Sequence, residues 1–230
     1  MTKDGKPSRI NDIRLFHSGE KNLTSLRTVG PLEGQEDAVA FGRRMAWFLN
    51  GEEFSCGSYA ALCIVFTPML GPGEIKITDE APDWWQRYVL IGAQEGFPNA
   101  PDAAETVKRE IVSVLKAIRP DLTALVDHAE DMVRTHGDGL RFLMQVRKNK
   151  HNMIELYFNV PVAPQPAYLF TAFTKMPKGQ FFEGPPLLIG SSGSPFDYNG
   201  PIKVAEVEKS FAEFTPKPRP AMSKPVRNRG

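Results

Sequence analysis

The sequence predicts an α+β protein with a mostly antiparallel sheet, a pair of helices packed on one face of it, and a further helix near the N-terminus. The first observation is the order of the patterns, in which strand-like segments come first, two helices follow, and more strand-like segments come last. This order favours α+β over alternating βαβ units. The second observation is composition, because 41% of the 230 residues are hydrophobic, which is enough to build a core.

The N-terminal third contains one helix and three strand-like segments. We expect residues 1–35 to form an irregular arm with room for one edge strand. The helix follows over residues 36–49, with acids in its first turn as the helix dipole prefers. An apolar segment, residues 59–67, predicts a buried strand, and residues 74–78 alternate as a hairpin partner of that strand would. Residues 85–91 predict a third strand.

The middle of the chain predicts two consecutive helices. The first begins at Asp102, and its apolar residues recur at helical spacing until Pro120 stops it. The second begins with Asp121 as a candidate N-cap and ends near Gly137. The apolar positions of the first helix are Val107, Ile111, Val114, Leu115 and Ile118.

Beyond the helices the apolar period changes from 3.6 to 2. Residues 140–146 and 154–160 alternate on either side of a polar turn, which predicts an antiparallel hairpin. We expect another strand over residues 168–174, short edge pieces at 181–182 and 187–189, and a short helix over 202–214. These assignments make residues 36–214 a single domain and leave residues 215–230 as a disordered, basic, Pro-rich tail.

Charge is distributed unevenly along the chain. The net charge is +1, but residues 216–230 hold five basic groups and no acids, whereas residues 15–215 hold 19 basic and 25 acidic groups, a net charge of −6. An acidic body is a poor surface for duplex nucleic acid, which requires basic residues on the folded face. It suits a basic protein partner better.

Cofactor and metal chemistry finds little support in the sequence. Cys56 and Cys63 are the only cysteines, and we interpret them as buried or reduced thiols because zinc sites need four clustered ligands. His128 and His136 are eight residues apart, which puts them two helical turns apart and beyond chelation of one ion. Neither a P-loop nor a dinucleotide fingerprint occurs. We expect no cofactor and no metal.

The chain also lacks a membrane-spanning pattern. Residues 1–14 are polar and charged, unlike the start of a signal peptide. The longest apolar run, Tyr59–Phe66, has eight residues, too few to cross a bilayer as a helix. We expect a cytoplasmic protein with no membrane partner.

One acidic and aromatic segment is the best candidate for an interface. Trp84 and Trp85 are adjacent, and successive strand residues face opposite sides, so one of them should reach the surface. Trp, Tyr and Arg dominate the energetic centres of protein interfaces, and acids surround them in this segment. The alternative is that one tryptophan is in the core and the other lies under the N-terminal arm. The candidate partner-binding residues are Asp79, Glu80, Asp83, Trp84, Trp85, Arg87, Tyr88, Glu95 and Phe97.

This part of the chain resembles small cytoplasmic α+β immunity proteins of bacterial toxin systems. The resemblance covers about residues 59–118 and rests on the order of four features: the 59–67 segment, the Gly-Pro-Gly turn at 71–73, the aromatic strand at 85–92, and the helix from Asp102. It implies no catalytic residues. It implies a stoichiometric inhibitor that binds a cognate toxin, and a nuclease with a basic groove would complement the acidic body.

Two other functions stay open. An enzyme can assemble its site from scattered acid and base groups, and Glu155, Asp138 and His136 around the hairpin are the candidates. A nucleic-acid accessory protein could instead hold its target through the basic tail, residues 216–230.

Overall fold

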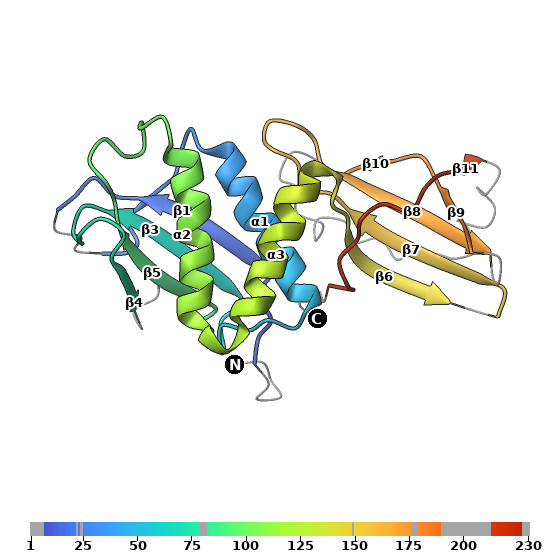
Figure 1. Cartoon of the computed structure of the whole chain (residues 1–230), viewed down its shortest axis with the longest axis horizontal. Helices are drawn as coiled ribbons and strands as arrows, with labels where there is room; N and C mark the ends of the chain where they lie inside the picture. The colour runs from blue at the N-terminus through green and yellow to red at the C-terminus, as the bar shows by residue number, and fades with distance from the viewer. Residues whose placement is uncertain are drawn as a thin grey trace. The chain divides into compact units, whose positions relative to one another are not determined.

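The computed structural model describes residues 7–21, 23, 25–78, 82–148, 150–175, 179–189 and 213–226 (Figure 1). The α+β class is confirmed, with three α-helices and two β-sheets. The chain divides into two compact units, Met1–Thr135 and His136–Gly230, where the sequence analysis expects one domain over residues 36–214. The division arises because the described strands form two separate sheets instead of one.

The first unit contains a five-stranded sheet with a parallel centre. Its order is β2-β1-β3-β5-β4. The inner strands β1, β3 and β5 run parallel to one another, and the edge strands β2 and β4 are antiparallel to their neighbours. The strands are β1 (Asp12–His17), β2 (Gly30–Pro31), β3 (Ala61–Thr67), β4 (Ile75–Thr78) and β5 (Gln86–Gly92).

Two expectations for this sheet were wrong. Residues 12–17 are not part of an irregular arm or an edge strand, because β1 lies between β2 and β3 and buries Ile13 and Leu15. The strand β4 pairs with β5 and not with β3. Both errors have the same cause: the helix after β1 serves as the crossover that a parallel β1–β3 pair requires, and β5 then takes the remaining edge of β3.

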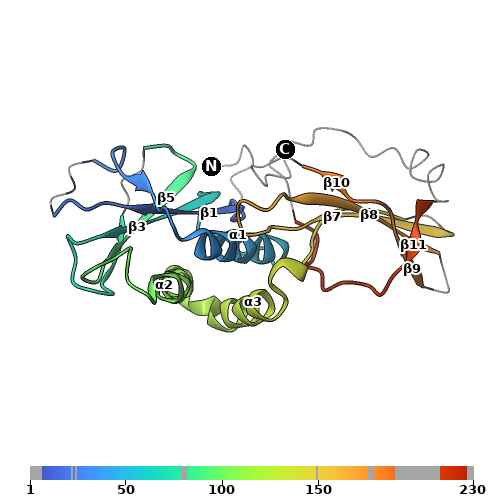
Figure 2. The same cartoon turned by 90° about the horizontal axis from the view of Figure 1, so that it is seen from above.

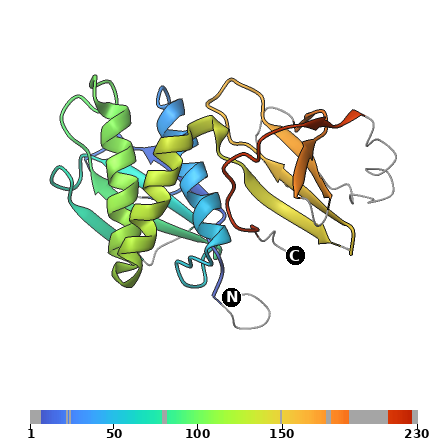
Figure 3. The same ribbon diagram turned by 45° about the vertical axis from the view of Figure 1, so that its right-hand side comes forward.

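The helices of this unit lie on one face of the sheet, as Figure 2 and Figure 3 show. Packing between them is close at Gly42, where an added Cβ atom would lie 3.3 Å from side-chain atoms of both Ile13 and Ile111. The three predicted helices are confirmed, with slightly shifted ends. They are α1 (Glu36–Gly51), α2 (Ala103–Ile118) and α3 (Thr123–His136), with 3₁₀ turns at Pro120–Leu122 and Gly137–Gly139.

Side chains from loops cover the opposite face of the sheet. A buried cluster of Cys63, Val65, Tyr88 and Leu90 projects from β3 and β5. Partly buried apolar residues pack against it, from β1 and from the segments that follow β1 and β3: Phe16, Leu23, Leu26, Val29, Met69 and Leu70. Both faces of the central strands are thus covered, as is usual for parallel strands.

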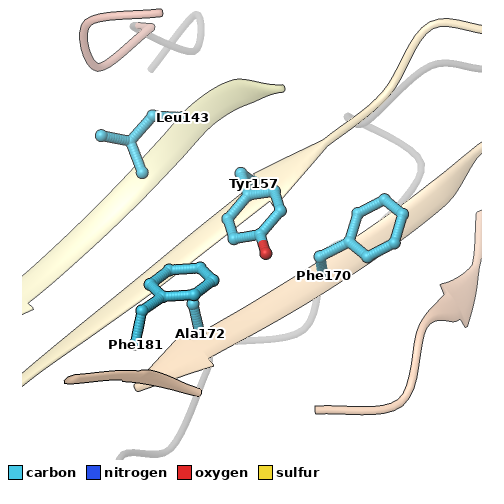
Figure 4. Packing of buried hydrophobic residues seen from close by; sticks show 5 residues of the cluster. All are labelled: Leu143, Tyr157, Phe170, Ala172 and Phe181. Carbon is cyan, nitrogen blue, oxygen red and sulfur yellow. The ribbon is translucent and has the colours of Figure 1, made fainter. Parts of the chain in front are cut away.

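The second unit is an antiparallel sheet. Its order is β11-β9-β8-β7-β6, and β10 pairs with β8 beyond this path. The predicted hairpin is confirmed as β6 (Phe142–Lys148) and β7 (Asn152–Phe158), with a register shift between Leu143 and Gln145. The remaining strands are β8 (Tyr168–Lys175), β9 (Gln180–Glu183), β10 (Leu187–Leu188) and β11 (Thr215–Pro216). An aromatic cluster lies on one face (Figure 4).

The C-terminal segment is more ordered than its composition suggests. Residues 215–216 form β11 against β9, and the Arg141 amide and carbonyl bond to Ala221 and Ser223, each at 2.9 Å. Val226 is buried. The expectation of disorder is therefore wrong for residues 215–226, because partners elsewhere in the unit hold them. Most of the short helix expected over 202–214 lies outside the described residues. Among the described helices, none is long and apolar enough to cross a membrane.

Close backbone contact at the end of β5 gives a test of the first sheet. A Cβ atom on Gly92 would lie 1.7 Å from the carbonyl oxygen of Gly71, which neither backbone can accommodate without moving. We expect Gly92→Ala to destabilise the protein by about 2 kcal/mol or more, measured by urea denaturation. Gly19→Ala is the matched control, since nothing lies within 4 Å of its added Cβ atom. Equal unfolding midpoints for the two variants would contradict this packing.

Candidate protein-binding site

The loop before β5 exposes a tryptophan on a fixed backbone. The Trp84 side chain has 69% of its surface exposed, and Asp83 beside it is also exposed. The Trp85 carbonyl accepts hydrogen bonds from the amides of Ala60 and Ala61 at 2.9 and 3.2 Å, and the Asp83 carbonyl accepts one from Gln86 at 3.1 Å, which closes the turn. Trp84 therefore projects into solvent from a backbone that is tied to the central strand.

The second tryptophan is partly covered. The Arg14 guanidinium lies 5.1 Å from the centroid of a Trp85 ring, and its Nε donates to Asp12 at 2.7 Å. A cation over a tryptophan face is attracted by the ring quadrupole. The prediction that one of the two tryptophans reaches the surface is confirmed, and the exposed one is Trp84. Trp85 instead packs against β1, the strand that the N-terminal arm contributes.

A second exposed apolar side chain lies in β4, on the other side of the β4–β5 connection from Trp84. In the described part of the first unit, Ile77 and Trp84 are the large apolar residues that stay exposed. They flank the chain between β4 and β5. Ile77 belongs to an edge strand, whose outer edge has no partner strand among the described residues. Asp79 and Glu80 fall between them but lie outside the described residues.

Two further predicted residues have roles inside the unit. Arg87 points to the opposite side from its neighbour Tyr88, donates to the Cys56 carbonyl at 3.0 Å and lies over the Tyr59 ring at 5.5 Å. Tyr88 is buried in the loop-covered face, where its ring stacks on Phe16 at 6.3 Å. Both side chains stabilise the fold where they lie.

The last two predicted residues lie beyond the other end of β5. The Phe97 ring stacks on Phe66 with centroids 4.8 Å apart and meets the edge of His17 at 5.5 Å. Glu95 is exposed in the loop before it. Asp83, Trp84 and Trp85 are thus neighbours in the loop before β5, Arg87 and Tyr88 belong to opposite faces of β5, and Glu95 and Phe97 lie beyond its other end. Sequence reasoning missed Ile77, although its place in a short, alternating edge strand is a usable signal.

The two cysteines are unsuited to nucleophilic catalysis. Burial raises the pKa of the Cys56 thiol to about 12, against a smaller lowering by Arg87 and Arg119. Burial likewise raises the pKa of Cys63 to about 11, although a hydrogen bond from Tyr88 opposes this. Both are free thiols and buried, which agrees with the interpretation from sequence. At neutral pH neither supplies the thiolate that a nucleophile requires.

Glu155 and Lys217, candidates for the two alternative functions, are paired within the chain. Glu155 is buried and accepts two hydrogen bonds from Arg219, at 2.9 and 2.8 Å. In the tail, Lys217 is paired as well, with Glu183 at 2.7 Å. Asp138 and His136 lie at the junction of α3 and a 3₁₀ turn, and the Asp138 carbonyl accepts from Arg141. Among the described residues, no group of three His, Cys, Asp or Glu side chains could hold a metal ion.

Comparison with known proteins adds no relative. No family model, curated protein or solved structure matches the chain. The resemblance to immunity proteins therefore stays a prediction from sequence.

The raised thiol pKa values predict a chemical test. With a pKa of about 11, about one molecule in a thousand carries the Cys63 thiolate at pH 8, and still fewer carry that of Cys56. We expect iodoacetamide at pH 8 to leave the folded protein unmodified and to add two labels in 8 M urea, as measured by intact mass. Rapid labelling of the folded protein would show that a thiol is accessible and ionised.

Proposed function

We propose that this protein is a non-catalytic protein-binding protein of the immunity type, which binds and neutralises a cognate toxin. The observation that carries the proposal is the exposure of Trp84 on a loop whose backbone is fixed to β3. An exposed tryptophan has only two rotatable side-chain bonds, so it loses little conformational entropy on binding, and it offers a large area for contact.

The size of the effect can be estimated from area. Burying about 150 Å² of a tryptophan contributes about 4 kcal/mol before the costs of association. Trp84 would form the centre of the interface, Ile77 would extend its apolar part along the edge strand, and Asp83 would lie at its rim. Such an arrangement, with an aromatic centre and a polar rim, is that of an ordinary protein interface.

The charge of the chain favours a basic partner. Residues 15–215 carry a net charge of −6. Acidic groups around the contact accelerate encounter with a basic surface and make the association rate depend on salt. A toxin with a basic substrate-binding surface, such as a nuclease, fits this requirement.

Truncating the exposed tryptophan tests the proposal. Affinity purification of the tagged chain from its native host, with mass spectrometry, supplies the partner. We then expect Trp84→Ala to weaken binding by about 2 kcal/mol, roughly 30-fold, because hot-spot truncations cost this much. Its fold should be unchanged, since the side chain is mostly in solvent. Isothermal titration calorimetry measures the first quantity and circular dichroism the second.

Leu188→Ala is the matched control, because Leu188 is also a large, exposed apolar residue but lies in the second unit. It should bind like the wild type. If both variants retain wild-type affinity for the partner, the Trp84 surface is not the binding site. If no stoichiometric partner is captured and the chain turns over a small molecule, the proposed function itself is wrong.

A further inference from the structure

Two buried carboxylates lie on one face of the second sheet. Glu155 of β7 and Glu183 of β9 are 3% and 8% exposed. Both are in register with Ala172 of β8, on its two sides, so the three side chains share a face. A buried carboxylate is costly unless a cation pairs with it. This face therefore requires positive charge close to the two carboxylates.

Aromatic residues surround the carboxylates on the same face. Figure 4 shows Tyr157, Phe170 and Phe181 around Ala172. The Tyr157 hydroxyl donates a hydrogen bond to the carboxylate of Glu183. The Thr174 hydroxyl oxygen, also buried on this face beside Phe181, has no hydrogen-bond partner in the described part of the chain. Among the described residues, this face thus combines aromatic rings, two carboxylates and a hydroxyl group that has no hydrogen-bond partner.

The C-terminal segment supplies the cations. We call residues 215–226 the strap. Its Lys217 pairs with Glu183 at 2.7 Å, and its Arg219 forms a bidentate pair with Glu155 while lying 5.1 Å from the Phe181 ring centroid. Met222 packs against the aromatic cluster. The two basic side chains are two residues apart, which in an extended segment directs both to the same side.

The paired side chains differ in exposure. The Lys217 and Arg219 side chains are 49% and 42% exposed, whereas, with the strap in place, the side chains of Glu183 and Glu155 are 9% and 5% exposed. The carboxylates belong to the strands β7 and β9, and the cations of the strap lie at the surface beside them. Arg141, 4.1 Å from the Phe170 ring centroid, contributes one further positive charge near Glu183. Glu155 is thus the carboxylate that relies on the strap.

We propose that this face is a binding site for an extended basic segment with two cationic side chains two residues apart. In the isolated chain the strap occupies the site, and a basic segment of a partner protein takes its place in the complex. The proposal does not depend on the Trp84 surface, because it concerns other residues in the other unit.

The test uses the full-length chain with a weakened strap. We combine Lys217→Ala with Arg219→Ala and measure the binding of a fluorescent peptide of residues 213–224 by anisotropy. The double variant should bind the peptide at least about tenfold more tightly than the wild type, whose own strap competes. Adding Glu155→Gln should abolish this binding. A peptide with alanine at both basic positions should not bind.

The matched control is Lys224→Ala, which removes a basic group from an exposed position of the same segment and should bind peptide as the wild type does. A folded double variant that does not bind the peptide would overturn the proposal. If the double variant does not fold, excess peptide added to the wild type should accelerate hydrogen exchange at residues 217–223, and unchanged exchange would overturn it. Formation of a dimer that Glu155→Gln abolishes would identify a second copy as the occupant and overturn the assignment to a partner protein.

Discussion

The parallel ladders on both sides of β3 are the constraint on which the first unit depends. All seven residues of this strand are buried, and it pairs along its length with β1 and β5. A strand buried on both faces needs a layer on each, and these layers are provided by the helices on one face and by Phe16 of β1 with loop residues such as Leu26 on the other. Polar and exposed groups are thereby confined to the ends and edges of the sheet, where Trp84 and Ile77 are found.

The second unit meets a different constraint. Its sheet buries Glu155 and Glu183, and the desolvation of two carboxylates has to be offset by cations. The strap provides them from positions 64 and 34 residues further along the chain. Its order therefore comes from backbone hydrogen bonds to β9, Arg141 and Leu143 together with electrostatic pairing and aromatic contact with the sheet. The same pairs that order the strap also use two of the basic groups that a nucleic-acid-binding tail would need.

Periodicity predicted the local elements well but could not predict their partners. The helix over Ala103–Ile118 and the hairpin of β6 and β7 have long, regular patterns, and both are found. The arm was expected to hold one edge strand at most, and the inner position of β1 was missed because its apolar residues are few and stand in a polar segment. The continuous apolar run of β3 indicates a strand buried on both faces, but it does not identify β1 and β5 as the partners, because a strand in a parallel sheet and one in a sandwich core look alike in sequence. The strap was missed because Pro, Lys and Arg are typical of disorder, and its partners are distant glutamates.

The candidate site was predictable only in part, because local patterns do not show which distant residues meet. Strand alternation predicts that one of two adjacent tryptophans is exposed, and Trp84 is exposed, although both tryptophans lie in the turn before β5 and not in a strand. Alternation also places Arg87 and Tyr88 on opposite faces of β5, but it does not show which face the helices cover and which face the loops cover. The contact of Arg14 with Trp85 joins residues 71 positions apart, which no local pattern reveals.

Hydrogen–deuterium exchange of the full chain, alone and with its captured partner, tests the central claim that the loop before β5 is the binding surface. We expect protection of residues 82–88 in the complex, because a bound partner excludes water from the loop around Trp84. Protection confined to other segments, with residues 82–88 exchanging as in the free chain, would contradict it.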